Sequence, residues 1–467
     1  MRNEVRPNPA LGLCPVRSDP DLPDTTDVVV IGGGLAGVSA AWHLARLGLR
    51  AVICEKGEIG AEQSGRNWGW CRNTLRTPAE IPLMRHSMHD WRDPSVFGAL
   101  DTGFRTTGIA YLTGRNRGDE AVYGAWLKSV AEFGLGSRML SARELAALVP
   151  GAARAVSGAI YTAEDGCAEP GKAAPAIAEA ARRLGVTILT RCAVRSLETE
   201  AGAVSAVITE RGRIGCRAVL LAGGIWSRRF LGNLGVDLPM LKVMGSVMFT
   251  KPMPGGPDVS VAGRRFGWRR REDGGYIVSQ ADATILDLTT DCFRLFNDFR
   301  PMIATGLKTL RLRLGRHLID EARLARSWQP DEITPFEQVR IAAPEPMAWV
   351  LDEARLKIAA AWPFFAGLEI AGSWGGYIDV TPDTLPVIGA VPQQPGLFLA
   401  TGLSGHGFGL GPGVGRLAAD LVAGVKPVVD PFTFRPERFA RAAQKKWAGD
   451  DVVTRPHDLS RAGCCPA

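Results

Sequence analysis

A short apolar segment that runs into a glycine-rich turn is the feature that most constrains this chain. Residues 27–31 read Asp-Val-Val-Val-Ile and lead directly into Gly32-Gly33-Gly34-Leu35-Ala36-Gly37. An alanine- and leucine-rich stretch (38–47) follows, and a second apolar segment (50–54) ends at Glu55. This order of strand, G-x-G-x-x-G turn, helix, strand and acidic residue is typical of a dinucleotide-binding βαβ unit.

The spacing within this unit predicts what its residues do. The interval from Gly32 to Glu55 agrees with the roughly 20 residues expected between the first glycine and a ribose-binding carboxylate. Gly32 permits the turn, Gly34 lets a pyrophosphate approach the backbone, and Gly37 allows the helix to pack closely on the strand. The first residues of the helix then present free N–H groups to the phosphates.

Composition excludes several classes of protein. With 467 residues, the chain can form one two-lobed unit or two to three domains. The hydrophobic (46%) and charged (22%) fractions are those of a soluble globular protein, and no apolar run reaches the ~18 residues that would span a membrane. The N-terminus lacks the apolar core of a secretory signal, and the nine cysteines show no metal-ligand spacing. We therefore expect a cytoplasmic protein with reduced thiols and no metal site.

The net charge of +7 does not by itself predict a nucleic-acid partner. The arginines are dispersed along the chain, and their densest cluster, at 264–271, is typical of a solvated surface. An attraction for anionic substrates or partners stays open. We expect no nucleic-acid binding.

The remaining pattern predicts two kinds of structure. A helix is expected at 172–184, and strands are expected at 186–189, 193–197, 203–209, 217–222 and 397–401. The middle of the chain differs, because antiparallel strands are indicated at 240–249, 275–279 and 356–361, and helices at 121–133, 142–148 and 291–314. The predicted class is thus α/β with a second α+β lobe.

Four segments in order carry a family resemblance. They are residues 27–56, Ser64-Gly65-Arg66-Asn67-Trp68-Gly69, residues 221–227, and the C-terminal pair 374–389 and 401–409. Together they resemble the FAD-dependent D-amino acid oxidase superfamily, which includes glycine oxidase, sarcosine oxidase and D-amino acid dehydrogenases. The resemblance implies a Rossmann-like FAD-binding domain of the glutathione-reductase type and a substrate domain of antiparallel sheet.

The predicted division of the chain is discontinuous. An N-terminal arm (1–24) and a C-terminal tail (435–467) flank the two domains. The FAD-binding domain takes residues 25–84, 156–235 and 366–434, and the substrate domain takes residues 85–155 and 236–365.

The resemblance also implies which residues hold FAD. Glu55 would bind the adenosine ribose, residues 64–67 would contact the pyrophosphate and ribityl chain, Val194 would face the adenine, and residues 402–409 would follow the pyrimidine edge of the flavin. No cysteine precedes Thr381-Pro382-Asp383, where sarcosine-oxidase relatives attach the flavin, so noncovalent FAD is expected. The full predicted set is Gly32, Gly34, Leu35, Ala36, Gly37, Glu55, Lys56, Ser64, Arg66, Asn67, Trp68, Val194, Ala222, Gly223, Trp226, Gly376, Gly402, Gly405, His406, Gly407, Phe408 and Gly409.

The last of these residues also suggest how the flavin is stabilised. Pro412 suits the first turn of a helix, and a helix N-terminus at flavin N1 and O2 stabilises the charge that builds up on reduction. His406 could add a donor there, or it could be a spacer that faces away.

The residues that bind the substrate are less clearly indicated by the sequence than those that hold the cofactor. Glycine-oxidase-like members carry an arginine after the W-x-G segment that binds the substrate carboxylate, but this chain has Ile378 there, followed by Asp379. Arg340 or Arg72 could replace that cation. Asp379 could attract an amine, contact the flavin, or cap a turn.

Aromatic residues complete the predicted catalytic set. Tyr276 could face the substrate or pack in its sheet, and Trp68, Trp70 and Trp374 could surround the substrate amine or belong to the core. The predicted catalytic residues are His406, Tyr276, Trp374, Asp379 and Arg340.

These residues favour a flavoenzyme that oxidises the C–N bond of an amino acid, an N-substituted amino acid or another amine to an imine, with hydride transfer to flavin N5. Oxygen or an electron carrier would reoxidise the flavin, and the chain could form homo- or hetero-oligomers. Three alternatives stay open: an FAD-binding subunit of an opine- or sarcosine-type dehydrogenase complex, an NAD-dependent dehydrogenase, and a member of the fold without activity.

Overall fold

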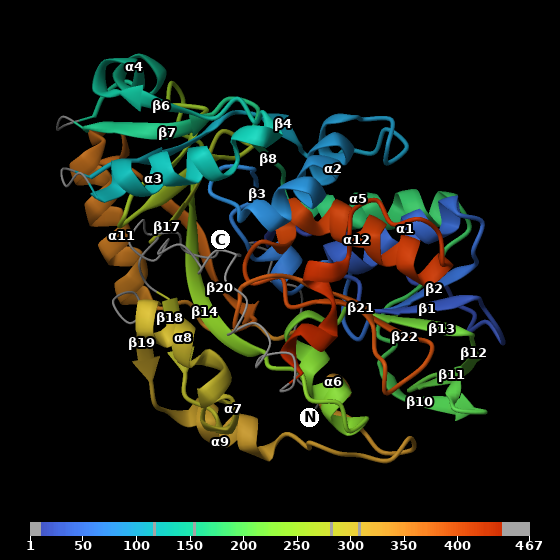
Figure 1. Ribbon diagram of the computed structural model, residues 1–467. Coiled ribbons are helices and arrows are strands. Elements are labelled where there is room, and N and C mark those ends of the chain that lie inside the picture. The colour runs from blue at the N-terminus through green and yellow to red at the C-terminus, as the bar shows by residue number, and fades with distance from the viewer. Residues whose placement is uncertain (1–10, 115–117, 153–155, 281–283, 307–309, 441–467) are drawn as a thin grey trace.

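A computed structural model describes residues 11–114, 118–152, 156–280, 284–306 and 310–440. Two sheets lie side by side in it, a smaller one on the right of Figure 1 and a larger one on the left. The smaller sheet has six strands in the order β21 (Val387–Ala390), β22 (Leu397–Thr401), β13 (Ala218–Leu221), β1 (Val28–Ile31), β2 (Ala51–Cys54) and β9 (Thr187–Leu189). All neighbouring strands are parallel except β21, which is antiparallel to β22.

Both faces of this parallel sheet are covered, which explains why its strands are continuous apolar runs. Val28 and Val30 of β1 pack into a core with the helices of one face, whereas Val29 packs into a second core on the opposite face. The helices are α1 (Leu35–Arg46), α5 (Pro170–Arg183) and α12 (Gly407–Ala423), and α2 (Ile81–Arg92) packs against α12. The opposite face carries a three-stranded antiparallel sheet of β10 (Val194–Glu200), β11 (Ala203–Thr209) and β12 (Gly212–Gly215), together with α6 (Ser227–Asn233).

The larger sheet has ten strands and is mostly antiparallel. Nine of them follow the order β19 (Leu310–Arg313), β18 (Thr284–Asp287), β14 (Leu241–Thr250), β17 (Tyr276–Ser279), β16 (Gly267–Arg270), β15 (Ser260–Ala262), β5 (Ile109–Leu112), β7 (Gly158–Thr162) and β6 (Arg138–Ser141). The tenth, β20 (Ile370–Val380), pairs with β14 along nearly its whole length. Two pairs, β15 with β5 and β18 with β19, are parallel, so the sheet is mixed rather than purely antiparallel.

Shorter elements surround the larger sheet. A small sheet of β3 (Trp70–Cys71), β8 (Gly166–Cys167) and β4 (Arg105–Thr106) lies beside it. The remaining helices are α3 (Gly118–Ser129), α4 (Ala142–Leu148), α7 (Thr290–Arg294), α8 (Phe296–Gly306), α9 (Arg316–Arg323), α10 (Pro335–Gln338) and α11 (Ala348–Ala361), of which α10 packs against the core of the smaller sheet. No helix within the described ranges has the length and apolar character needed to cross a membrane.

The structure confirms the predicted α/β class and corrects two predicted elements. Residues 356–361 are the end of α11 and not a strand, because the buried Leu351, Ala354 and Ile358 follow helical spacing while Leu356 is exposed. Residues 291–314 do not form one helix. They form α7, α8 and then β19, which pairs with β18.

The two sheets do not follow the predicted domain boundaries. β7 and β20 belong to the larger sheet, although both lie in segments that we assigned to the FAD-binding domain. Within the N-terminal arm, Asp19 binds Arg182 of α5 and the backbone of Ile188 in β9, which ties residues 11–24 to the smaller sheet. The adjacent Cys464 and Cys465 lie outside the described residues.

Candidate active site

One large cavity lies between the two sheets. It begins at the carboxyl ends of β1, β2 and β13, where ligands of open α/β sheets bind, and extends to β14 and β20 of the larger sheet. Its volume is about 1650 Å³, a figure that includes the opening to solvent. The predicted cofactor residues that line it are Gly32, Gly34, Leu35, Ala36, Glu55, Lys56, Ser64, Arg66, Asn67, Trp68, Val194, Ala222, Gly223, Trp226, Gly376, Gly405, Gly407 and Phe408.

The glycine turn between β1 and α1 has the geometry that a pyrophosphate needs. Gly32 has a φ of 112°, and a Cβ there would lie 2.5 Å from the carbonyl oxygen of Ala222. A Cβ on Gly37 would lie 2.1 Å from the carbonyl oxygen of Gly32. Gly37 itself does not line the cavity; it lets α1 approach β1, so its part in cofactor binding is indirect. The N-terminus of α1 therefore opens onto the cavity, where it would suit an anion.

Glu55 is both a ligand candidate and an organiser of the turn. Its Oε2 accepts a hydrogen bond from Gly33 N and its Oε1 accepts one from Gly57 N, both at 2.7 Å. Burial raises the pKa of Glu55, against the effect of Lys56 and of these two backbone donors. Each carboxylate oxygen has a second acceptor site, so the residue fits the hydroxyls of a ribose.

Polar contacts close the far end of the cavity, where Val194 lies and adenine is expected. Lys56 Nζ donates to Glu62 Oε1 at 2.7 Å and lies 4.5 Å from the centre of the Trp226 ring. It also donates to the carbonyl oxygens of Val339 and Arg340. The segment 335–342, which begins with α10, thereby lies against the cofactor side of the molecule.

Arg340 is not placed to bind a substrate carboxylate. Its guanidinium binds both carboxylate oxygens of Glu210, and its Nη1 donates to the carbonyl oxygen of Lys56 at 3.0 Å. The structure speaks against the prediction that it replaces the missing family arginine, because three of its N–H donors bind Glu210 and Lys56 and the residue lies beside Lys56, at the end of the cavity where adenosine is expected. The other candidate, Arg72, is also excluded, because it is fully buried outside the cavity, donates to Thr74 O and lies over the Tyr111 ring.

We expect Arg340→Ala to weaken FAD binding rather than substrate binding. Loss of the Glu210 and Lys56 contacts frees the 335–342 segment at the adenosine end, so the dissociation constant of FAD should rise about tenfold. Titration of the apoprotein with FAD, monitored by flavin fluorescence, measures this change. Arg191→Ala, which breaks an exposed pair with Glu58, is the matched control. If Arg340→Ala leaves the FAD affinity unchanged and raises the substrate KM, Arg340 binds the substrate carboxylate after all.

The N-terminus of α12 faces the cavity, but the His406 side chain does not. Gly407 and Phe408 line the cavity, whereas His406 Nδ1 lies 2.9 Å from Glu80 Oε1. Burial and the nearby Arg76 lower the pKa of His406 to about 4. Burial alone would raise the pKa of Glu80, but His406, Arg76 and Thr77 outweigh it and hold it at about 2. At neutral pH the imidazole is therefore neutral and donates Nδ1–H to the carboxylate, so it is not the flavin donor that we considered.

This pair predicts acid sensitivity. The folded chain keeps His406 neutral, while the unfolded chain binds a proton below about pH 6.5, so the free energy of unfolding falls as the pH drops from about 6.5 to about 4. The free energy of unfolding falls further between about pH 4.5 and about pH 2, because Glu80 is protonated in the unfolded chain at a higher pH than in the folded chain. Titration of His406 accounts for about 3 kcal/mol of this fall in the free energy of unfolding, at about 1.4 kcal/mol per pKa unit.

Urea unfolding of the holoenzyme at a series of pH values measures the effect. His406→Asn keeps an N–H donor for Glu80 and removes the titration, so the difference between wild type and variant isolates this residue from other buried histidines such as His43. Equal pH slopes for the two proteins between pH 6.5 and 4 would contradict the assignment.

Asp379 caps a turn at the edge of the cavity. Its Oδ2 accepts from Gly402 N at 2.9 Å and from Leu403 N at 3.2 Å, and its Oδ1 accepts from Gln63 Nε2 at 2.9 Å. Burial raises the pKa of Asp379, against the effect of these donors. Of the three roles considered, the structure supports turn capping, and this turn leads into α12. Gly402 lies within it at a φ of 66° and does not line the cavity.

Most of the aromatic residues that were predicted to surround the substrate belong to the hydrophobic core. The Tyr276 hydroxyl donates to Pro257 O at 2.9 Å and the residue is fully buried, so the prediction that it faces substrate is wrong. Trp374 packs on Phe249 with ring centres 5.7 Å apart, and neither Trp374 nor Trp70 lines the cavity. Trp68 does line it. Gly409 does not, because its backbone packs against β3.

The sequence did not reveal the side chains at the end of the cavity that faces the larger sheet. Gly245 of β14 and Gly376 of β20 are paired in register, and a Cβ on Gly245 would meet only Ile378 Cδ1, at 3.9 Å. Among the residues that the structure describes, those lining this part of the cavity are uncharged. They are Met244, Gly245, Val247, Ser279, Gln280, Thr284, Tyr377 and Ile378.

Comparison with known proteins agrees with this geometry. The family model described as FAD dependent oxidoreductase matches residues 27–421. The L-amino acid deaminase of Proteus myxofaciens, solved in complex with anthranilate, is 34% identical with a TM-score of 0.88, over 92% of this chain and 97% of that one. The L-amino acid deaminase of Proteus vulgaris is 32% identical with a TM-score of 0.87, over 91% of this chain and 100% of that one.

A curated relative extends the comparison to another member of the family. The glycine oxidase of Pseudomonas putida is 25% identical, over 88% of this chain and 98% of its own length. The glycine turn, the two inward-facing helix N-termini and the buried Glu55 fit FAD, which supplies a hydride acceptor at its N5 atom when bound. The chain belongs to the FAD-dependent oxidoreductase family and is an FAD-dependent enzyme that oxidises CH–NH donors.

Proposed function

We propose that this enzyme oxidises the α-C–N bond of an L-amino acid. The α-C–H bond breaks with its electron pair going to FAD, the amine loses a proton, and water hydrolyses the imine to a 2-oxo acid and ammonia. The observation that carries the proposal is the likeness to the two Proteus L-amino acid deaminases over nearly the full length of both chains. That the residues predicted above from the family resemblance hold FAD is part of the same proposal.

The chain's own residues contribute by binding and orientation. Free N–H groups at the start of α12 would stabilise negative charge on the reduced cofactor. The space around Gly245, whose described lining residues are uncharged, would hold the substrate side chain and exclude water from the reacting bond. No strong base is required, because an unprotonated amine suffices for hydride transfer.

A second candidate substrate is an N-methyl amino acid. Mouse mitochondrial sarcosine dehydrogenase is 24% identical over 95% of this chain, which spans 46% of the relative's length. The two candidates give different products, because an L-amino acid releases ammonia and an N-methyl amino acid does not.

Anaerobic visible spectroscopy of the purified holoenzyme tests the proposal. L-Phenylalanine, L-leucine, their D-enantiomers, glycine and sarcosine are added separately, and bleaching of the oxidised-flavin band by L-amino acids with release of ammonia is expected. Bleaching by D-amino acids or sarcosine alone would contradict it. Return of the colour when air is admitted identifies oxygen as the acceptor.

Gly245→Val tests where the substrate lies. The added side chain would project into the space between β14 and Ile378, so the KM of the bleaching substrate should rise more than tenfold while FAD per chain is unchanged. Gly367→Val, at an exposed position with no neighbour within 4 Å, is the control. An unchanged KM in Gly245→Val would place the substrate elsewhere.

A further inference from the structure

Trp68 packs against the larger sheet at a glycine of β16, where the strand has no side chain. The residue is 7% exposed and lines the cavity, and its ring lies edge-to-face against Trp70 with centres 4.9 Å apart. Gly267 of β16 lies against the indole, because a Cβ at this position would be 2.4 Å from the Trp68 ring. The indole therefore occupies the place that a side chain at 267 would fill.

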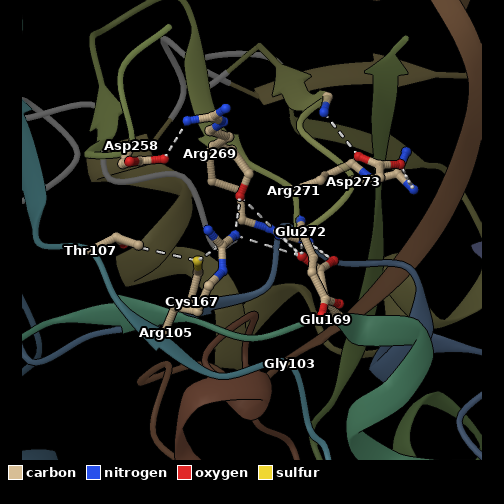
Figure 2. A network of polar contacts seen from close by, with 12 residues as sticks. Gly103, Arg105, Thr107, Cys167, Glu169, Asp258, Arg269, Arg271, Glu272 and Asp273 are labelled. Carbon is tan, nitrogen blue, oxygen red and sulfur yellow. Dashed lines mark hydrogen bonds and ion pairs between the residues drawn. The ribbon is translucent and has the colours of Figure 1, made fainter. Parts of the chain in front are cut away.

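The same strand also holds the Trp68 backbone. Arg269 lies two residues after Gly267, so both point to the same face of the sheet. Its Nε donates to the carbonyl oxygen of Trp68, and its Nη1 and Nη2 donate to Glu169 Oε1 and Oε2 at 2.8 and 2.9 Å. Figure 2 shows this arginine and Glu169 within a larger network of polar contacts.

Neighbouring residues fix the guanidinium in one orientation. Arg269 is 1% exposed, and Glu169, which precedes α5, also accepts from Glu272 N at 2.9 Å. Gly69 has a φ of 81°, and a Cβ there would lie 2.7 Å from Arg269 Nε. A buried ion pair is weak evidence for added stability, whereas removing one partner leaves an uncompensated buried charge.

We infer that Arg269 is a positioning residue, which together with Gly267 fixes Trp68 as a wall of the cavity where the cofactor and substrate meet. The substrate part of this inference rests on the proposed function. Trp68 lines the cavity, whereas Arg269 does not line it and acts through Trp68.

Four single variants of the holoenzyme test the inference. Arg269→Met removes the contact to Trp68 O, Gly267→Ala displaces the indole without touching Arg269, and Trp68→Ala removes the wall. Arg270→Met is the control, since the neighbouring Arg270 pairs with the exposed Asp258. Arg269→Met and Gly267→Ala should each raise KM about tenfold, change kcat less than threefold and alter the visible circular dichroism of bound FAD. Arg270→Met should match wild type.

Combination with Trp68→Ala separates positioning from a structural effect. In that background Arg269→Met should change KM less than twofold, whereas an equal tenfold rise would overturn the inference. Wild-type visible circular dichroism in Gly267→Ala would also overturn it, even if Arg269→Met does not fold. If no L-amino acid bleaches the flavin, the proposed function fails, and the circular dichroism of the variants still decides the inference on its own.

Discussion

Alanine in place of Gly37 should abolish FAD binding. A Cβ at this position would lie 2.1 Å from the carbonyl oxygen of Gly32, and that oxygen belongs to the backbone of the glycine turn itself. No side-chain rotation relieves such a contact, so α1 must move away from β1 and the turn must change shape. The helix N-terminus would then no longer be aimed at the pyrophosphate.

The FAD content of the purified variant, read from its visible spectrum, measures the effect. We expect less than one tenth of the wild-type content, even when excess FAD is added. Gly232→Ala is the matched control, since Gly232 lies in α6 with no neighbour within 4 Å, and it should retain FAD fully. Normal FAD content in Gly37→Ala would mean that α1 tolerates a shift from β1.

A second large loss of FAD affinity is expected for Asp379→Ala. The change leaves Gln63 Nε2, Gly402 N and Leu403 N without their acceptor in a buried place. Each unsatisfied buried donor costs about 1–3 kcal/mol, so the turn before α12 should lose its conformation. Since this turn sets the start of α12, FAD affinity should fall at least about 100-fold, which corresponds to about 2.7 kcal/mol.

Asp379→Asn keeps an acceptor at the same place and should lose less affinity than the alanine variant. Calorimetric titration of the apoproteins with FAD compares the three. If Asp379→Ala binds FAD as wild type does but no longer reacts with substrate, the carboxylate acts on the amine and not on the turn.

Local sequence patterns predicted the parts of this molecule that local interactions determine. The β1–α1–β2 unit was predicted because its strands, its turn glycines and Glu55 are close in sequence, and Glu55 does bind Gly33 of the glycine turn and Gly57 after β2. The α/β class followed for the same reason. The segment 356–361 was mistaken because six residues of alternating character fit both a strand and the end of a helix.

The substrate end of the cavity could not be predicted from such patterns. It depends on the register of β14 with β20, which brings Gly245 opposite Gly376 although the two are 131 positions apart in the sequence. Arg340 was assigned to the substrate because it is a cation in the right part of the chain, but its position depends on Glu210 in another element. Tyr276 was assigned to the substrate site by its place on a strand. The structure instead packs it under α11, and the sequence of one strand does not show which of its faces a distant helix covers.

The path of β20 limits how such an enzyme can diversify. Nearly the whole of this strand is paired with β14 in the larger sheet, and the side chain of Asp379, near its C-terminal end, holds the turn that starts α12. A chimera that exchanged residues 236–365 with those of a relative would import β14 without its β20 partner and would have to rebuild ten paired positions. New substrate preferences are therefore more accessible through single substitutions facing the cavity than through exchange of a whole lobe.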